Sequence, residues 1–333
     1  MMAKPGAKNL ITDVSGIRVG QAEDTAVRTG ATVILADKPL VAAVCVAGGG
    51  PGTRETDLLE GGTLVDAVDA IVLSGGSAFG LAAADGVAAG LKKAGRGFGL
   101  IDLPSVPKSP IVPSAILYDL ANGGNKDWGE ISPYAALGRK AYDTASDTFS
   151  LGRAGAGFGA AAGAHLGGTG SASVVTQDKF TIGAIAAVNC YGSVYMPGTE
   201  AFWAWPYEID GEFGGVRPPA DFAMDPEDWG AAKMNPSRGQ NTTIACIATD
   251  AILTPDQAKR VAQMALSGFS RAIRPVFAPF DGDAVFVLAT GKRALPEPAP
   301  APVARIGELA AGTLARAIAR GVYIAGKAKG GTS

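Results

Sequence analysis

The sequence predicts a mixed α/β (α+β) fold, because segments typical of strands alternate with segments of helical periodicity along the whole chain. The chain has 333 residues, of which 47% are hydrophobic and 18% are charged, so a large core can be buried. This length and composition are compatible with a single domain over residues 1–333.

The N-terminal part is predicted to contain several strands and one helix. The runs NLITDVSGIRVG, ATVIL and VAAVCVA are rich in Val and Ile and punctuated by Gly and Asp, which is typical of short strands. The run GGGPG at 48–52 indicates a turn, and 68–73 is predicted to be a buried strand. Residues 77–94 have Ala, Leu and Val at helical spacing, with Ser77 as the expected N-cap.

The middle of the chain shows weaker patterns. Residues 103–114 are rich in proline and are expected to connect to a strand-like run, AILYDL. The glycine-dense run 152–170 lacks the GxGxxG spacing of a dinucleotide site, so close backbone packing is expected instead. Strands are predicted at 172–177 and 182–189. Residues 196–240 have little periodicity but three tryptophans, which indicates an ordered loop.

Regular structure is predicted to resume at Thr242, where the run TTIACIATDAIL begins as a strand. A helix follows from Thr254 to about Ile273, with Thr254 and Gln257 in the spacing of a capping box and a proline at the first helical position. AVFVLAT is expected to be a strand and PEPAPAP a stiff spacer. Residues 304–325 are expected to form an amphipathic helix.

Charge and cysteine content argue against several classes of function. The formal net charge is −2 and Lys and Arg form no basic block, so nucleic acid is not an expected partner. No run is long and apolar enough for a membrane span or a signal peptide, so no membrane partner is expected. The three cysteines are widely spaced and odd in number, which predicts no disulfide framework and fits the cytoplasm. We expect neither a cofactor nor a metal ion.

The chain contains a single histidine, His165, which limits the hydrolase mechanisms open to it. A Ser-His-Asp site would need that residue, and a zinc site with several histidines is impossible. A Thr at a chain N-terminus can instead use its own α-amine as the base, because the pKa of that amine is near 8, about two to three units below that of lysine. In RGQNTTIACIATD, polar residues precede Thr242 at the head of a buried strand. Taken alone, this segment is also typical of an ordinary turn.

RGQNTTIACIATD resembles the processing site of the self-cleaving L-aminopeptidase/D-esterase (DmpA-type) family, which includes β-peptidyl aminopeptidases and nylon-oligomer (6-aminohexanoate oligomer) endohydrolases. Seven further segments follow the order of this family over nearly the whole chain: NLITDVSGIRVGQ, LSGGSAFGLAAADGV, SAILYDL, GRAGAGFG, GGTGSAS, AVNCYG and PFDGDAVFVLATG. The resemblance implies a four-layer αββα sandwich, in which sheets pack face to face between helical layers. It also implies a homotetramer or a larger homo-oligomer.

The resemblance implies that the chain cuts itself between Asn241 and Thr242, into an α chain of 1–241 and a β chain of 242–333. Thr242 would then be the nucleophile and its freed amine the base. Asn189 matches the family's active-site asparagine, whose side-chain amide can donate to a developing oxyanion.

Three other residues match site positions of the family. Asp281 and Asp283 match the acidic pair of the nylon-oligomer branch, where the aminopeptidase branch has Ser and Glu, and the pair would orient Thr242 and hold its ammonium form. Tyr118 matches a tyrosine near the cleft, whose hydroxyl could donate to the substrate or the oxyanion. Substrate-binding residues cannot be assigned from the sequence.

Two positions depart from the family. Members often have a His after RVG, where this chain has Gln21, and many have a Lys in or just before the glycine pair that precedes GSAS. Here the segment is Ala164-His165-Leu166-Gly167-Gly168, so His165 is a candidate replacement for that lysine.

The resemblance implies a hydrolase of amide bonds that works through an acyl-Thr242 intermediate. The leading interpretation is an aminopeptidase or amidase that acts on small peptides with a free N-terminus. The alternative is an endohydrolase of 6-aminohexanoate oligomers, which the Asp281 and Asp283 pair favours. Acyl transfer, as in self-cleaving ornithine acetyltransferases, and a binding protein without activity are further alternatives.

Overall fold

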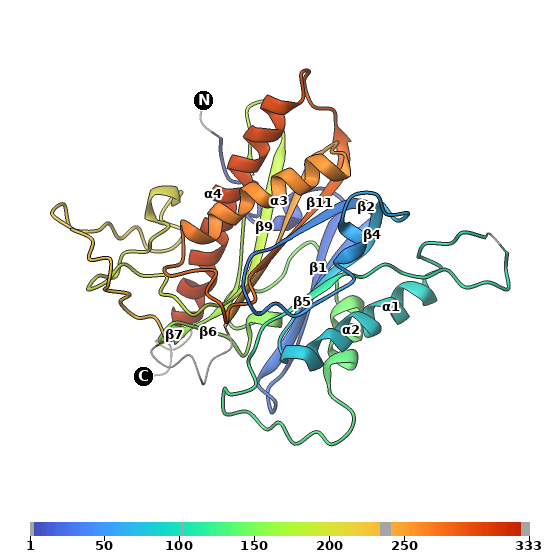
Figure 1. Ribbon diagram of the computed structural model, residues 1–333, viewed down its shortest axis with the longest axis horizontal. Helices are drawn as coiled ribbons and strands as arrows, with labels where there is room; N and C mark the ends of the chain where they lie inside the picture. Colours follow the sequence, from blue (N-terminus) through green and yellow to red (C-terminus); the bar gives the residue numbers. More distant parts are fainter. Residues whose placement is uncertain (1–2, 102, 234–240, 328–333) are drawn as a thin grey trace.

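The computed structural model describes residues 3–101, 103–233 and 241–327. Their helices and strands are arranged in four layers (Figure 1). The long helices are α1 (Ala83–Lys93), α2 (Tyr134–Asp143), α3 (Pro255–Ser270) and α4 (Pro300–Lys327). The strands of the main sheet are β1 (Ile17–Asp24), β2 (Thr29–Val46), β3 (Thr53–Arg54), β4 (Ala67–Ser74), β5 (Ser114–Ile116), β8 (Gly168–Val175), β9 (Thr181–Asn189), β10 (Thr242–Ala251) and β11 (Ala284–Arg293). Short elements are β6 (Ala161–Ala162), β7 (His165–Leu166) and the 3-10 turns η1 (Ile11–Asp13), η2 (Asp57–Leu59), η3 (Ser77–Ala82), η4 (Gly155–Gly157) and η5 (Trp205–Tyr207).

The strands form one nine-stranded sheet in the order β3-β5-β4-β2-β11-β10-β9-β8, with β1 also paired to β2. Most neighbours are antiparallel, but β10 with β11 and β4 with β5 are parallel, so the sheet is mixed. In Figure 1, α3 and α4 cover one side of the strands and α1 and α2 lie on the opposite side. The predicted mixed α/β class is therefore confirmed.

The 18-residue strand β2 belongs to both halves of this sheet. Because side chains alternate along a strand, Ile34 and Ala42 both face an inner core that they share with residues of β9, β10 and β11. On the other face, Val33 packs with α1 and α2, whereas Ala43 packs with α3 and α4. The sheet therefore folds over along β2, and its halves pack face to face between two helical layers, as an αββα sandwich does.

Several predicted elements are confirmed. The helix after Thr254 begins with the expected capping box, in which Thr254 Oγ1 accepts from the Gln257 N–H at 3.2 Å. The strand beginning at Thr242 is present and is buried along its whole length. Strands β8, β9 and β11 lie at the predicted positions within a few residues.

Three local predictions were wrong, and one helix was missed. The two runs ATVIL and VAAVCVA are parts of the single strand β2, because this strand crosses both halves of the sheet. The residue before the turn η3 is Gly76, and Ser77 has a left-handed backbone (φ 52°), so Ser77 is not an N-cap. Helix α4 begins at Pro300, inside the predicted spacer. Helix α2 was not predicted, because its ten residues have no capping side chain at their start. The last part of the predicted loop, 234–240, lies outside the described residues.

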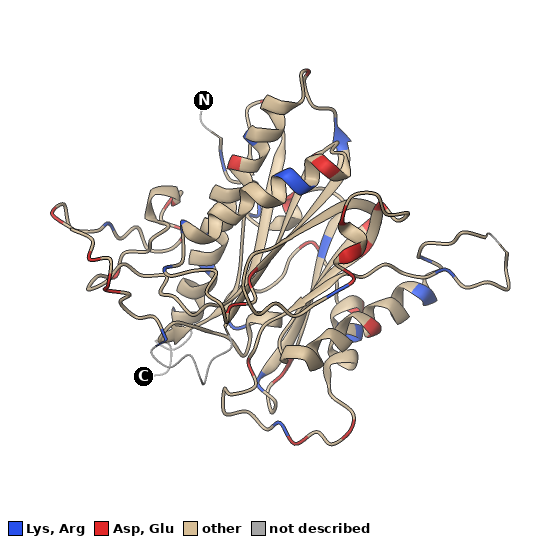
Figure 2. Ribbon diagram, viewed as in Figure 1, with Lys and Arg blue, Asp and Glu red and all other residues tan. Residues whose placement is uncertain are grey.

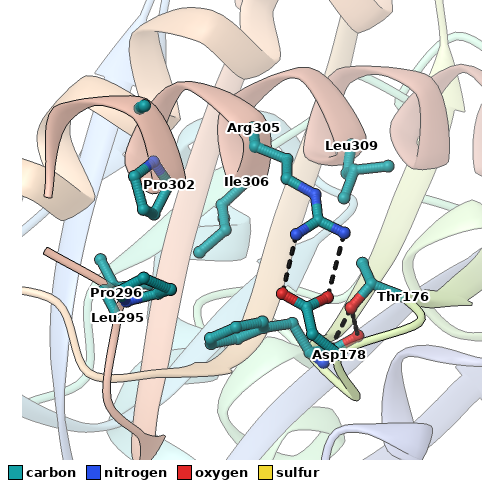
Figure 3. Close-up of a pocket in the computed structure, with 10 residues that line it drawn as sticks. Thr176, Asp178, Leu295, Pro296, Pro302, Arg305, Ile306 and Leu309 are labelled. Atoms are coloured by element: carbon teal, nitrogen blue, oxygen red, sulfur yellow. Dashed lines mark hydrogen bonds and ion pairs between the residues drawn. The ribbon is translucent and has the colours of Figure 1, made fainter. Parts of the chain in front are cut away.

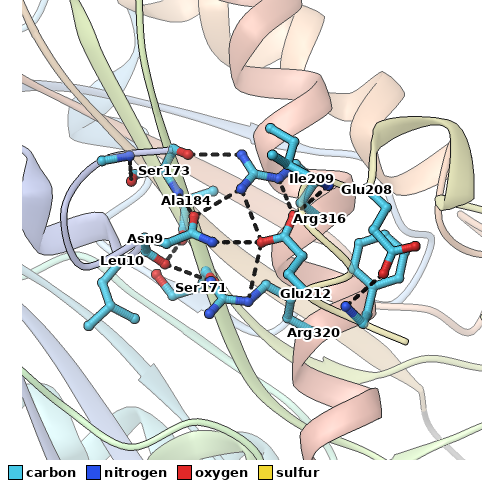
Figure 4. A network of polar contacts seen from close by, with 12 residues as sticks. Asn9, Leu10, Ser171, Ser173, Ala184, Glu208, Ile209, Glu212, Arg316 and Arg320 are labelled. Carbon is cyan, nitrogen blue, oxygen red and sulfur yellow. Dashed lines mark hydrogen bonds and ion pairs between the residues drawn. The ribbon is translucent and has the colours of Figure 1, made fainter. Parts of the chain in front are cut away.

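A buried ionic cluster joins α4 to the loop of residues 196–233 and to the N-terminal segment (Figure 4). Arg316 Nε lies 2.5 Å from Glu212 Oε1, and their side chains are 3% and 8% exposed. Asn9 Nδ2 donates to Glu212 Oε2 at 2.6 Å, and Arg316 also donates to the Ser173 carbonyl at 2.8 Å. Arg320 Nε lies 3.5 Å from Glu212. Each buried charge therefore has charged or hydrogen-bonded partners.

Near its N-terminus, α4 makes an exposed ion pair (Figure 3). Arg305 donates to both carboxylate oxygens of Asp178, at 2.8 and 3.0 Å. The two side chains are 51% and 42% exposed. Water competes for such a pair, so its contribution to stability is small.

We expect Glu212→Ala to lower the free energy of unfolding by about 3–5 kcal/mol, because it leaves the buried guanidinium group of Arg316 and the partly buried one of Arg320 without their carboxylate. Asp178→Ala, which breaks an ion pair on the same helix at the surface, should cost less than about 1 kcal/mol. Urea denaturation of the two variants and the parent protein measures the difference. Equal destabilisation by both substitutions would contradict this account of the cluster.

Candidate active site

Thr242 is the first residue of β10, between β9 and β11. Its side chain shares the inner face of the sheet with Ile244 and Cys246, because alternate residues of a strand lie on one face, and it is 3% exposed. Thr242 Oγ1 donates to the backbone carbonyl oxygen of Asn241 at 2.5 Å. The hydroxyl therefore lies against the carbonyl group that precedes it in the chain.

A second donor reaches the same carbonyl oxygen. The Gly282 N–H donates to Asn241 O at 2.9 Å, in a short parallel pairing of Asn241 with Asp281. A Cβ atom at position 282 would lie 2.6 Å from Thr242 Oγ1, so only glycine allows this close approach. The Asn241 carbonyl is thus polarised by a fixed backbone donor, as an oxyanion site requires.

Asn189 ends β9 and is the cross-strand partner of Thr242. Its Oδ1 accepts from the Ala161 N–H at 2.9 Å, which directs the amide nitrogen to the other side, where it donates to the Tyr118 carbonyl at 2.9 Å. An amide nitrogen carries two N–H groups. Within the described residues, this contact uses one of them, so the other can serve as a donor in the site.

Asp281 and Asp283 precede β11 and are 2% and 1% exposed. Asp283 Oδ1 accepts from the Thr243 N–H at 2.6 Å, and its Oδ2 accepts from the Phe277 N–H at 3.3 Å, so it holds the start of β10. Asp281 Oδ2 accepts from the Ala278 N–H at 2.9 Å. Burial raises the pKa of both carboxyl groups, and the charge of Asp281 raises the pKa of Asp283 further.

A cavity of about 660 Å³ opens onto Thr242. Its walls come from the loop after β2, the turn η3, the end of β5 and the loop before β11, and they consist of Gly50, Pro51, Gly52, Thr53, Ser77, Ala78, Leu81, Ile116, Tyr118, Thr242, Pro279 and Phe280. None of these lining residues carries a charged side chain. The cavity therefore suits a neutral substrate segment beside the reactive hydroxyl.

The Gly76–Ser77 turn forms one wall of this cavity. Gly76 has φ 87°, and a Cβ atom there would lie 2.0 Å from the Tyr134 ring, so this position requires glycine. Its N–H donates to Asp119 Oδ1 at 2.8 Å, and burial raises the pKa of this carboxyl group. The strained conformation of Ser77 places it on the lining of the cavity, and such strain is often found at functional sites.

Comparison with known proteins shows the family of the chain. The family model named Peptidase family S58 matches residues 9–333. The chain belongs to peptidase family S58. An uncharacterized aminopeptidase of Mycobacterium bovis is 42% identical over 94% of this chain and 93% of its own length. The 6-aminohexanoate-oligomer endohydrolase of a Kocuria species is 31% identical over 87% and 78%. A β-aminopeptidase of a Burkholderia species, with a solved structure, has a TM-score of 0.69 at 25% identity and covers 96% and 88% of the two chains.

Membership of the S58 family makes the chain a hydrolase of amide bonds, as the sequence predicted. The family resemblance is therefore confirmed. The structure brings Thr242, Asn189, Asp281 and Asp283 to one end of the inner core, and Tyr118 lines the adjoining cavity.

His165 lies away from this S58 site. It is exposed, its ring packs at a tilt against that of Tyr195 with centroids 4.7 Å apart, and it lines a separate cavity with Phe202 and Tyr323. The sequence predicted it only as a candidate replacement for the family lysine. It does not line the cavity at Thr242.

A lysine that was not predicted reaches the site from the loop before the proposed cut. Lys233 Nζ donates to the Asn189 carbonyl at 3.2 Å. Burial lowers the pKa of Lys233 to about 8, while Cys190 and Asp281 raise it. No signal in the sequence pointed to Lys233, because this residue lies in a segment without periodicity. None pointed to Gly282, because Gly282 acts through its backbone N–H, a group that nearly every residue type has.

Neither buried cysteine is suited to be the nucleophile. Burial raises the pKa of Cys190 to about 12 and also raises that of Cys246, and reactive cysteines need the thiolate form. Among the described residues, no group of three or more His, Cys, Asp or Glu side chains could hold a metal ion. No helix within the described ranges has the length and apolar character to span a membrane.

Proposed function

We propose that this S58 chain is an amide hydrolase whose nucleophile, Thr242, is released by self-cleavage after Asn241. The observation that supports this proposal is the contact of both Thr242 Oγ1 and the Gly282 N–H with the Asn241 carbonyl oxygen. The hydroxyl and a donor for the developing negative charge are thus in place before reaction. The products would be an α chain of 1–241 and a β chain of 242–333.

In the maturation step, Thr242 Oγ1 attacks the carbonyl carbon of Asn241. The new C–O bond replaces the C–N bond, and the hydroxyl proton ends on the Thr242 nitrogen. Water then hydrolyses the ester, leaving a carboxyl group on Asn241 and a free amine on Thr242. The Gly282 N–H donates a hydrogen bond to Asn241 O and so stabilises the oxyanion that forms there.

In turnover, the Thr242 amine accepts the hydroxyl proton while Oγ1 attacks the substrate amide. The remaining N–H of Asn189 is the proposed donor to the oxyanion, and the Tyr118 hydroxyl is proposed to donate to the substrate. The leaving amine takes the proton from the Thr242 ammonium, and water hydrolyses the acyl-enzyme. Asp283 fixes the start of β10 through the Thr243 N–H, and Asp281 is proposed to hold the ammonium form.

Two classes of substrate fit this site. Small peptides with a free N-terminus are the leading class, in agreement with the aminopeptidase relatives. The second class is 6-aminohexanoate oligomers, the substrate named for relatives at 30–31% identity. Among the described residues, the lining of this cavity includes no carboxylate that could pair with a substrate ammonium, which favours this second class.

We further propose a cytoplasmic location and a homotetramer or larger homo-oligomer. The three cysteines, Cys45, Cys190 and Cys246, are all free thiols, which suits a reducing compartment. Lys and Arg are spread among Asp and Glu over the described elements in Figure 2, and nucleic acid is not a proposed partner.

The matched substitutions Thr242→Val and Thr243→Val test the nucleophile. Thr242→Val should leave one intact chain of the full mass and no measurable amide hydrolysis, because it replaces the attacking hydroxyl by a methyl group of similar size. Thr243→Val should be cleaved and active, since the buried Thr243 hydroxyl has no hydrogen-bond partner among the described residues. Intact-mass spectrometry and an amidase assay measure both. A wild-type sample that is fully active but uncut would refute the proposal.

Gly282→Ala should slow self-cleavage by about 10- to 100-fold, because displacing a reacting atom by about an ångström has an effect of that size. The added Cβ atom would lie 2.6 Å from Thr242 Oγ1 and 3.0 Å from the Gly50 carbonyl oxygen. Gly61→Ala is the control, because its nearest neighbour would be Asp256 Oδ1 at 3.7 Å. The measurement is the fraction of uncut chain against time after synthesis. If the Gly282 variant were cleaved at the control's rate, the close approach of residue 282 to Thr242 Oγ1 would not matter for self-cleavage.

The substrate class can be tested with one amide that carries a free ammonium group and one that does not. Alanine p-nitroanilide has a free ammonium group, and N-acetylated 6-aminohexanoate oligomers have none. Faster hydrolysis of the first supports an aminopeptidase, and faster hydrolysis of the second supports an endohydrolase. We expect the first result, in agreement with the aminopeptidase relatives, and the second result would assign the endohydrolase activity that the neutral cavity lining favours.

A further inference from the structure

We propose that Lys233 is a positioning residue for the Thr242 amine: it holds the carbonyl opposite that amine and keeps a positive charge beside it. The inference rests on the proposed function, because the amine exists only after the cut. Its consequence is a base that stays neutral, and therefore active, at a lower pH than an isolated α-amine would.

The strand pairing shows which way the Thr242 nitrogen points. The Thr243 N–H is directed to the β11 side, where Asp283 accepts it, and successive N–H groups of a strand point to opposite edges. The Thr242 nitrogen therefore faces β9. Since Asn189 is its partner in the antiparallel register, the Asn189 carbonyl lies opposite this nitrogen.

Lys233 Nζ donates to that same carbonyl oxygen at 3.2 Å. Two donors that share one acceptor at normal hydrogen-bond lengths lie within about 6 Å of each other. The ammonium group of Lys233 is therefore a near neighbour of the Thr242 nitrogen. It also lies within electrostatic reach of Asp281.

The position of Lys233 does not depend on the bond that is cut. Its backbone N–H donates to the Tyr191 carbonyl at 2.9 Å, and the Ala231 carbonyl accepts from the Ala164 N–H at 2.7 Å. Ala232 between them is buried. These contacts anchor residues 231–233 on elements far from the cut in sequence, so Lys233 stays in place when the Asn241–Thr242 bond is broken.

The charged groups around the amine act in opposite directions. Asp281 and Asp283 favour its ammonium form and raise its pKa, whereas the Lys233 cation lowers it. Lys233 itself faces Asp281 and Cys190. Although burial lowers the pKa of Lys233 to about 8, its ammonium form still predominates at neutral pH. That positive charge disfavours a second proton on the nearby Thr242 amine, which therefore stays neutral.

The experiment compares the pH dependence of kcat/KM for the cleaved wild type, Lys233→Met and Lys233→Arg, with an uncharged amide as substrate. The acid limb reports the base that must be neutral in the free enzyme. Lys233→Met should move this limb up by about one pH unit, because it removes a charge near the amine. Lys233→Arg keeps the charge and should restore the wild-type limb.

Lys259→Met is the matched control, because Lys259 also donates to a strand carbonyl, Val44 O at 2.9 Å, and pairs with Glu60. Its acid limb should equal that of the wild type. An unmoved limb in Lys233→Met, or a limb in Lys233→Arg that moves as far as in the Met variant, would overturn the inference. If the wild type is active without being cut, the proposed function fails instead, and intact mass separates the two failures.

A measurement on the wild type covers the case in which Lys233→Met does not fold. The α-amines of the cleaved protein can be labelled by reductive methylation with ¹³C-formaldehyde and titrated by NMR. The Thr242 amine should have a lower pKa than the N-terminal amine of the α chain, which serves as the internal reference. An equal or higher pKa for Thr242 would overturn the inference.

Discussion

The site depends on one constraint, which is the pairing of β10 with strands on both of its edges. The antiparallel register with β9 places Asn189 beside Thr242, and the parallel pairing of Asn241 with Asp281 brings the Gly282 N–H to the Asn241 carbonyl. Because both are backbone pairings at the start of a buried strand, they have little freedom to adjust.

The face that Thr242 occupies follows from the same pairing. Even-numbered residues at the start of β10 point into the inner core between the two halves of the sheet, whereas Ala245 and Ile247 pack under α3 and α4. A shift of register by one residue would turn the hydroxyl toward the helices and away from the cavity. The apolar residues of β10 thus determine where the polar residue at its end points, which links core packing directly to chemistry.

The sequence allowed the mixed class, the helix after Thr254 and the strand at Thr242 to be predicted, because periodicity and capping are local properties. It also indicated Thr242, Asn189, Asp281, Asp283 and Tyr118 through resemblance, and the structure brings these residues to one end of the core. The continuity of β2 could not be predicted, since it depends on how the sheet folds over. Lys233 was missed for a related reason: its role arises from which carbonyl it reaches, and that contact joins residues 44 positions apart.

The strand order has a consequence for the life of the protein after the proposed cut. Strands β10 and β11 lie between β2 and β9, so the C-terminal piece is inserted in the middle of the sheet contributed by the N-terminal piece. Separation would break the sheet along two edges, which keeps the nicked molecule together while it stays native. Once denatured, however, the two fragments would have to find each other in solution, and recovery would become bimolecular and dependent on concentration. After self-processing, the protein would no longer refold as a single chain, and its lifetime would depend on how slowly the native molecule unfolds.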